Sequence, residues 1–331
     1  MAIPVIDMSN LNGKDRKNIM AQIARACEEY GFFQLVNHGI PHPLMDRVKH
    51  VCSENFKLER EQKFLTESLP VKTLNKALVE SANGSSAEPK KIDNVDWEDV
   101  FEILYDQKEY EWPSQPSEFK ETMEEFGKEV TKLAETLLEI LSENLGLEKN
   151  YLKKTFGGPG SQAFFGTKVS HYPPCPRPDL ITGLRPHTDA GGVILLFQDD
   201  VVGGLEVLNN GKWIDVQPMI NAIVIDVGDQ VEAISNGKYK SAWHRILATE
   251  NGNRRSVASY YNPSLDAVIG PALQLTSKAK KQDCNGNVNI NGSEMPSYPN
   301  FVYADYMTVY AKQKYLPKEP RFQAMAGTYI D

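Results

Sequence analysis

Apolar residues in the first part of the chain recur at the spacing of helices. Residues 116–145 carry an apolar side chain every three or four positions, which predicts one long helix with a single buried face. A shorter pattern of the same period follows Asn12-Gly13 and ends at Gly31, and strands are predicted on either side of it, at 3–7 and 32–36. The long stripe consists of Phe119, Met123, Phe126, Val130, Leu133, Leu137 and Leu141.

After residue 160 the pattern changes to short apolar runs separated by turn signals such as Asn209-Asn210-Gly211, Asn236-Gly237 and Asn251-Gly252. Short strands at this spacing are typical of a sandwich or a jelly roll. We therefore predict a mainly β fold with flanking helices around a double-stranded β-helix, or jelly-roll, core. The expected single domain has a helical N-terminal part with edge strands at 1–155, the jelly-roll core at 160–272, and a C-terminal helix and tail at 298–331.

Three further segments are predicted from their local composition. Residues 303–315 have the pattern of a helix. Residues 80–95 and 283–292 are polar and rich in serine, asparagine or glycine, which favours surface loops.

Composition limits the kind of partner. The 331 residues are 41% hydrophobic and 24% charged, with a net charge of -8, which disfavours nucleic acid and anionic membranes and favours a small-molecule partner. No stretch approaches the roughly 20 apolar residues of a membrane span, so we expect a cytoplasmic protein. The four cysteines form no Cys-x-x-Cys pair and are expected to be reduced thiols. The oligomeric state stays open.

Candidate chemistry centres on His187, Asp189 and His244. The first two are two residues apart next to an apolar run, so in an extended strand their side chains point the same way. His244 follows the turn at Asn236-Gly237 and would arrive from a neighbouring strand. Two histidines and one carboxylate are the donor set of non-haem Fe(II) oxygenases, in which open metal positions accept O2 and a chelating substrate. His38, at a strand-to-turn corner, is instead expected to be a hydrogen-bonded structural residue.

A second candidate feature is Arg254-Arg255-Ser256, ten residues beyond His244. Its outer members share one face of a predicted strand. A guanidinium beside a hydroxyl can hold a carboxylate or bicarbonate, because arginine offers a rigid fork of donors and stays charged.

Several motifs resemble the plant-type non-haem iron and 2-oxoglutarate-dependent dioxygenase superfamily: Tyr172-Pro173-Pro174-Cys175-Pro176, His187-x-Asp189, His244 and Arg254-x-Ser256. More narrowly, the chain resembles the 1-aminocyclopropane-1-carboxylate oxidases, a family of ethylene-forming enzymes. The segments that carry this narrower resemblance are 165–170, 187–192, 195–200, 236–241 and 318–322. The likeness extends over almost the whole chain.

The resemblance implies a double-stranded β-helix in which His187, Asp189 and His244 bind Fe(II). It implies an amino-acid substrate and O2 as reactants, ascorbate as reductant, and bicarbonate or CO2 as activator. It also implies catalytic roles for Lys168 and Arg185. The residues that it places around substrate, bicarbonate and ascorbate are Tyr172, Gln198, Arg254, Ser256, Lys314 and Arg321.

Four residues depart from the family pattern, namely His171, Pro186, Trp243 and Gln323. Proline fixes the backbone next to one ligand and tryptophan adds bulk next to another, so the pocket could differ in shape. The leading hypothesis is oxidation of 1-aminocyclopropane-1-carboxylate to ethylene, cyanide and CO2. One alternative keeps the iron site but uses 2-oxoglutarate, as a hydroxylase or desaturase of a plant small molecule. Another is a non-catalytic jelly-roll binding protein, which the intact ligand set disfavours.

Overall fold

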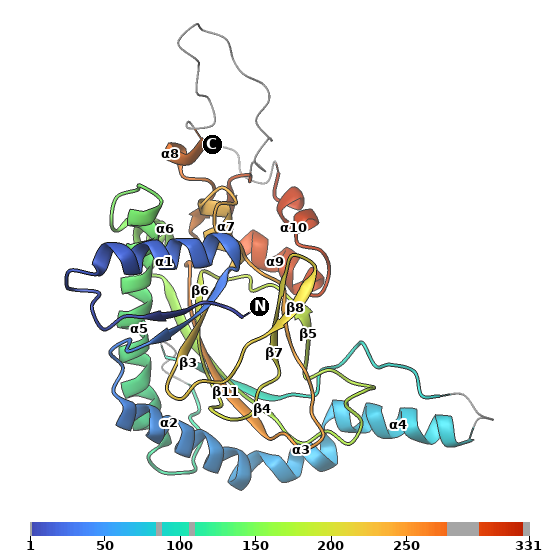
Figure 1. Cartoon of the computed structure of the whole chain (residues 1–331). Helices are drawn as coiled ribbons and strands as arrows, with labels where there is room; N and C mark the ends of the chain where they lie inside the picture. The colour runs from blue at the N-terminus through green and yellow to red at the C-terminus, as the bar shows by residue number, and fades with distance from the viewer. Residues whose placement is uncertain (1, 84–87, 106–109, 277–297, 327–331) are drawn as a thin grey trace, which may run out of the picture.

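A computed structural model describes residues 2–83, 88–105, 110–276 and 298–326. Two β-sheets face each other, and the helices Arg16–Glu29, His42–Asn55 and Phe119–Asn144 cover the outer face of the larger one (Figure 1). The larger sheet contains, in order across it, β1 (Val5–Asp7), β2 (Phe32–Val36), β9 (Ile223–Val227), β6 (Val193–Gln198), β11 (Arg254–Asn262), β4 (Phe164–Tyr172) and β3 (Asp99–Leu104). The smaller sheet contains β5 (Leu184–His187), β10 (His244–Ile246), β7 (Leu205–Asn209) and β8 (Lys212–Asp215).

Helices come mainly before and after the sheets in sequence. A short pair, β12 (Val268–Ile269) and β13 (Phe301–Val302), leads into the C-terminal helices. The first half contributes α1 (Arg16–Glu29), α2 (His42–Asn55), the π-helical turn η1 (Phe56–Arg60), α3 (Glu61–Glu67), α4 (Leu69–Asn83), α5 (Phe119–Asn144) and α6 (Tyr151–Gly157). The second half contributes α7 (Asp229–Ile234), α8 (Leu273–Thr276), α9 (Tyr303–Gln313) and α10 (Glu319–Ala324).

Alternation along the strands builds two apolar layers. On β9, Ile223, Ile225 and Val227 face α1, α2 and α5, while Val224 faces the smaller sheet. The layer between the sheets also contains Leu205, Val207 and Ile246. Because successive strand residues point to opposite faces, one sheet separates a helix-facing core from an inner space. The sheet-rich fold with a jelly-roll core is confirmed.

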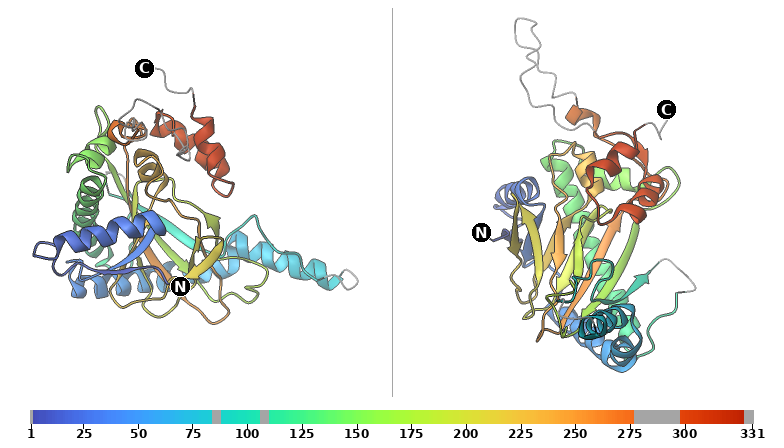
Figure 2. Two further views of the ribbon diagram at one scale, coloured as in Figure 1. Left: turned by 45° about the horizontal axis from the view of Figure 1, so that its top comes forward. Right: turned by 90° about the vertical axis from the view of Figure 1, so that its right-hand side faces the viewer.

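The helix predicted at 116–145 is α5, and the whole predicted apolar stripe is buried on it. The strand predicted at 32–36 is β2, and Gly31 has a φ of 71° where α1 gives way to that strand. The prediction that 80–95 forms one loop is wrong at its start, because α4 continues to Asn83 and buries Val71 and Leu74 at helical spacing. Figure 2 shows α4 projecting from the body of the molecule. The predicted loop at 283–292 lies outside the described residues.

The C-terminal segment is fastened to α7 by two ion pairs, of which one is fully buried. Arg321 Nη1 lies 2.9 Å from Asp229 Oδ2, and both side chains are 0% exposed. Lys318 Nζ lies 2.6 Å from Glu232 Oε2. Asp229 and Glu232 are three residues apart on α7, as are Lys318 and Arg321 at α10, so the two pairs run side by side. Within the described residues no helix has both the length and the apolar character needed to cross a bilayer.

Replacing Arg321 should therefore destabilise the fold. Arg321→Met keeps most of the buried volume but leaves Asp229 without its partner, and uncompensated buried charges cost about 3–5 kcal/mol. We expect a loss of that size in the free energy of unfolding, measured by chemical denaturation. The matched control is Arg177→Ala, which removes an exposed pair with Asp179 and should change stability little. Equal stability of the two variants would contradict the fastening role of Arg321.

Candidate metal centre and active site

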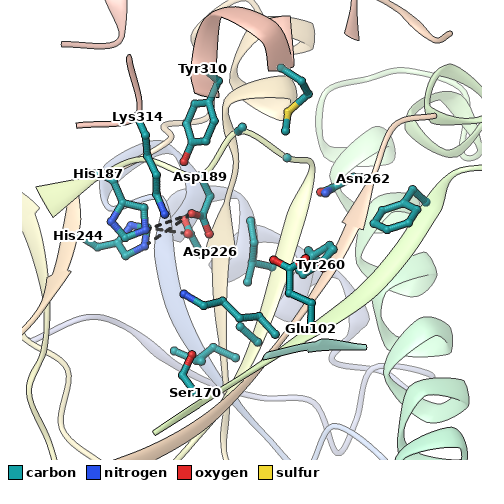
Figure 3. A pocket seen from close by; sticks show the side chains of 18 of the residues that line it. Glu102, Ser170, His187, Asp189, Asp226, His244, Tyr260, Asn262, Tyr310 and Lys314 are labelled. Carbon is teal, nitrogen blue, oxygen red and sulfur yellow. Dashed lines mark ion pairs between the residues drawn. The ribbon is translucent and has the colours of Figure 1, made fainter. Parts of the chain in front are cut away.

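Strand register brings the candidate ligands together. On the smaller sheet, β10 pairs with β5 in antiparallel register, and His244 stands directly opposite His187. Their ring centroids are 4.2 Å apart. Asp189 follows two residues after His187, and its Oδ1 lies 3.4 Å from His187 Nε2 and 3.9 Å from His244 Nε2 (Figure 3). Within the described ranges, these three form the one cluster of His, Cys, Asp or Glu with the spacing of a metal site.

Hydrogen bonds orient both imidazoles toward this point. His187 Nδ1 lies 2.9 Å from the carbonyl oxygen of Arg185, and His244 Nδ1 lies 3.2 Å from that of Ala242. A protonated Nδ1 donates to each carbonyl, which leaves the Nε2 lone pairs directed at the space beside Asp189. The ring of Phe32 packs 5.1 Å from that of His244 and limits its rotation. The donor set of two neutral nitrogens and one carboxylate fits Fe(II).

The surroundings favour the deprotonated forms that metal binding requires. Burial, helped by the neighbouring His187, lowers the pKa of His244 to about 3. Burial by itself would raise the pKa of Asp189, but the contact with His187 and the charges of both histidines bring it well below its usual range. His244 and Asp189 therefore need no deprotonation when they bind a cation at neutral pH.

The metal ligands open into a cavity of about 950 Å³ between the two sheets. Its lining includes the apolar side chains of Phe32, Leu184, Leu205 and Ile246 and the polar ones of Arg254 and Ser256. Tyr310 on α9 and Lys314, just after that helix, reach toward the ligands (Figure 3). The cavity is large enough for a small amino acid together with further small ligands.

The predicted clamp is assembled within that cavity. Arg254 is 2% exposed, and its guanidinium donates to Ser256 Oγ and to Gln198 Oε1, each at 3.2 Å. The register explains the grouping, because Arg254 stands opposite Tyr172 on β4 and Ser256 stands opposite Gln198 on β6. The guanidinium carbon also lies 5.2 Å from the centre of the Tyr172 ring. Arg254 thus presents a buried, oriented positive charge to the cavity.

Two other predicted cations reach the cavity. Lys168 lies on its wall, and its Nζ is 2.9 Å from Glu98 Oε1. Lys314 extends from the end of α9 toward Asp189, and no hydrogen bond or ion pair is described for its ammonium group (Figure 3). Burial, with the positive charge of Lys168, lowers the pKa of Lys314.

Arg185 and Arg321 are placed behind the site rather than in the cavity lining. Arg185 forms a two-pronged ion pair with Asp96 and stacks 3.9 Å from the ring centre of Tyr315. Arg321, besides its pair with Asp229, donates from Nη2 to Thr188 Oγ1 at 3.1 Å. Thr188 lies between two metal ligands in sequence, so Arg321 supports the metal-binding loop. Contact of Arg185 or Arg321 with a bound small molecule stays a prediction.

Two acidic residues of the site escaped the sequence analysis. Glu98 binds Lys168 and Tyr172, and nothing near it in sequence indicated those partners. Asp226 lies within the apolar strand β9, lines the cavity, and has one oxygen 3.8 Å from His244 Nδ1. Neither of its oxygens has a hydrogen-bond partner among the described atoms, and burial together with the charge of Asp189 raises its pKa well above the usual range. The sequence signal that could have revealed Asp226 is a carboxylate within an otherwise apolar strand.

The four departures from the family pattern lie outside the described cavity lining. His171 is buried, hydrogen-bonded to Asn253, and 4.8 Å from the ring of Phe56. Pro186 is part of β5 next to His187, and Trp243 precedes β10, where its carbonyl accepts from Leu208 N at 2.7 Å. Gln323 is exposed on α10. Their side chains therefore do not shape the described cavity wall directly.

Fold and donor set together define a non-haem iron oxygenase. Residues 163–263 match the model of the 2OG-Fe(II) oxygenase superfamily, and residues 3–123 match that of the non-haem dioxygenase N-terminal region named for morphine synthesis. A solved structure of JOX2 in complex with 2OG, Fe and JA is similar, with a TM-score of 0.73 and 30% identity over 98% of this chain and 89% of that one. The dioxygenase for auxin oxidation in rice shares the fold, with a TM-score of 0.66 at 21% identity, covering 94% of this chain and 95% of that one.

Relatives with curated descriptions narrow the class. The chain is 58% identical to a 1-aminocyclopropane-1-carboxylate oxidase of Musa acuminata and 57% identical to 1-aminocyclopropane-1-carboxylate oxidase 5 of Arabidopsis thaliana, in each case over 98% of this chain and 99% of the relative. An oxidase of Cucumis melo is 50% identical over 98% of this chain and 94% of its own length. The chain belongs to the 1-aminocyclopropane-1-carboxylate oxidase family.

The metal site predicts that replacing His244 abolishes Fe(II) binding, whereas replacing His38 does not. His244→Ala should abolish Fe(II) binding, measured by anaerobic equilibrium dialysis, while the metal-free protein unfolds cooperatively as before, because His244 supplies a ligand rather than core packing. His38→Ala is the matched control. The structure gives His38 the hydrogen-bonded role expected from the sequence, with Nε2 at 2.9 Å from the carbonyl oxygen of Asn221, so this variant should still bind Fe(II). Iron binding by the folded His244→Ala protein would refute the site.

Proposed function

We propose that this protein oxidises 1-aminocyclopropane-1-carboxylate to ethylene, with ascorbate as reductant and bicarbonate as activator. The observation that carries the proposal is that His187, Asp189 and His244 line the same cavity as the Arg254 clamp. The family membership and the names of the relatives point to the same substrate. The reaction balances when one substrate, one O2 and one ascorbate give ethylene, HCN, CO2, two waters and dehydroascorbate.

Iron bound by these residues would supply O2 activation and electron transfer, which amino-acid side chains alone do not provide. The chain's own contribution is placement. His187, Asp189 and His244 all line the cavity, so a metal held by them would face the space that we assign to the amine and carboxylate of the substrate. Much of the cavity lining is apolar, which strengthens the electrostatic interactions within that space.

Arg254 and Ser256 are the residues we propose for bicarbonate. Their side chains are buried, face the cavity and already contact each other, so an anion would meet an oriented fork and a hydroxyl. The Arg254 Nε has no described hydrogen-bond partner, which leaves donor capacity for a ligand. Lys314, at the other side of the metal ligands, is proposed to attract the substrate carboxylate or ascorbate.

Use of 2-oxoglutarate is the second candidate function. It is favoured by one observation, namely that a solved relative at 30% identity was determined with 2OG and Fe. In that case Arg254 and Ser256 would hold the distal carboxylate of the keto acid. A substrate hydroxylation or desaturation would accompany its conversion to succinate.

Product analysis separates these two candidates. Purified protein supplied with Fe(II), ascorbate, bicarbonate and 1-aminocyclopropane-1-carboxylate should release ethylene without added 2-oxoglutarate, as measured by gas chromatography. Added 2-oxoglutarate should not yield succinate. The folded His244→Ala variant serves as the blank for non-enzymatic ethylene. Succinate in the absence of ethylene would establish the second function and overturn the first.

The clamp can be tested by exchanging one donor geometry for another. Arg254→Lys keeps the charge but loses the fork, so we expect kcat to fall about tenfold or more and the response to bicarbonate to weaken. The matched control is Arg255→Lys, whose side chain belongs to the opposite face of β11, and it should retain both. A normal bicarbonate response in Arg254→Lys would remove Arg254 from this role.

A further inference from the structure

The carboxylate of Glu98 connects two residues of the cavity wall. Lys168 Nζ lies 2.9 Å from Glu98 Oε1 and 3.0 Å from Oε2, and the Tyr172 hydroxyl donates to Oε1 at 2.5 Å. The side chain of Glu98 is 8% exposed and that of Lys168 is 23% exposed. Lys168 and Tyr172 line the cavity, whereas Glu98 stands behind them. The contacts of Glu98 therefore control side chains that a ligand would meet.

Glu98 is itself held by a rigid neighbour. Trp97 is 2% exposed, its indole Nε1 donates to the carbonyl oxygen of Pro173 at 2.9 Å, and its ring packs edge-on to Phe64 at 5.4 Å. The Trp97 backbone N–H also donates to the carbonyl oxygen of Thr182 at 2.9 Å. Glu98 is thus attached to a fixed point next to the smaller sheet and not to a loose loop.

The same short segment pairs with a second cation. Asp96, two residues before Glu98, binds Arg185 through both carboxylate oxygens and accepts from the Tyr315 hydroxyl at 2.9 Å. Of the five cations predicted for the site, Lys168, Arg185 and Arg321 are therefore neutralised by acidic partners. Arg254 and Lys314 have no described ion pair and face the cavity.

We propose that Glu98 is a positioning residue that holds Lys168 and Tyr172 at the cavity wall and cancels the charge of Lys168. Anionic ligands are then bound by Arg254 and Lys314, while Lys168 contributes a directed N–H rather than a free charge. This inference rests on the proposed function, because it assigns the residues that set ascorbate affinity in that reaction.

The substitution Glu98→Gln tests both parts of the inference. Glutamine keeps the shape but replaces one of the two oxygens that accept from Lys168 with an NH2 group. The ammonium therefore loses one acceptor and its counter-charge, and the site gains one net positive charge. The KM for ascorbate should fall roughly threefold to tenfold, the size expected of one nearby charge behind a partly wet wall. The kcat for ethylene should fall about tenfold or more, because Lys168 is displaced. General loss of structure would lower kcat without lowering KM.

Glu102→Gln is the matched control. Glu102 lies on β3 directly opposite Lys168 in the register, is exposed, and lines the same cavity. The substitution Glu102→Gln also removes one negative charge near the cavity, but it leaves the contacts of Glu98 intact. We expect both kinetic constants to stay within about twofold of the parent, because solvent screens the charge of the exposed Glu102 far more than that of the buried Glu98 side chain. Equal shifts in the two variants would overturn the positioning role, because cavity charge alone would then explain them.

Two further variants show whether Glu98 acts through Lys168. Glu98→Asp keeps the charge, so ascorbate KM should return to the parent value while kcat recovers in part. In a double-mutant cycle with Lys168→Met, Glu98→Gln should have little additional effect on kcat. Full additivity in that cycle would overturn the proposal.

A readout that needs no turnover separates this inference from the proposed function. The rate of acylation of Lys168 by acetic anhydride, followed by peptide mass spectrometry, should rise several-fold in Glu98→Gln and stay unchanged in Glu102→Gln, because only the first variant loses the carboxylate that holds the Lys168 Nζ. An unchanged rate in Glu98→Gln would overturn the inference even if ethylene is produced. Absence of ethylene from the parent protein would overturn the proposed function alone.

Discussion

The metal site depends on the register of one pair of short strands. His187 and His244 are direct partners across β5 and β10, so their rings reach the same point from neighbouring strands. A shift of one residue would turn one histidine to the opposite face of the sheet, because strand side chains alternate. The turn at Asn236-Gly237, where both residues have positive φ, returns the chain toward β10. Asp189 completes the site because it comes two residues after His187.

Around the ligands lies a layer of side chains drawn from the whole chain. Asp96 and Glu98 arrive from the N-terminal half, Asp226 from β9, and Tyr310 from α9. Asp96 and Glu98 pair with cations, and Tyr310 supports the loop between His187 and Asp189. Asp226 lines the cavity. The jelly roll therefore supplies the ligands and the clamp, whereas the flanking segments decide which charges remain available to a ligand.

Features that depend on local spacing could be predicted from the sequence. The two-residue spacings of His187 with Asp189 and of Arg254 with Ser256 follow from strand alternation, and the stripe on α5 follows from helical periodicity. Contacts between distant segments could not be predicted, because nothing near Glu98 in sequence indicates Lys168. Arg321 illustrates the limit: the family resemblance placed it near the ligands, but only the fold shows the Asp229 carboxylate that it pairs with. The helix α4 was missed in part because polar residues near its end resemble a loop.

The fastening of the C-terminal segment has a consequence for biosynthesis. The ribosome makes all three metal ligands before it makes Tyr310 and Arg321, whose hydrogen bonds to Thr188 hold the loop between His187 and Asp189. A nascent chain that has folded its sheets therefore carries the ligands on an unsupported loop. The metal site is fully oriented only when α9 and α10 have left the ribosome and α10 has packed against α7. Iron loading then becomes a late event, which follows the synthesis of α9 and α10 rather than that of the ligands themselves.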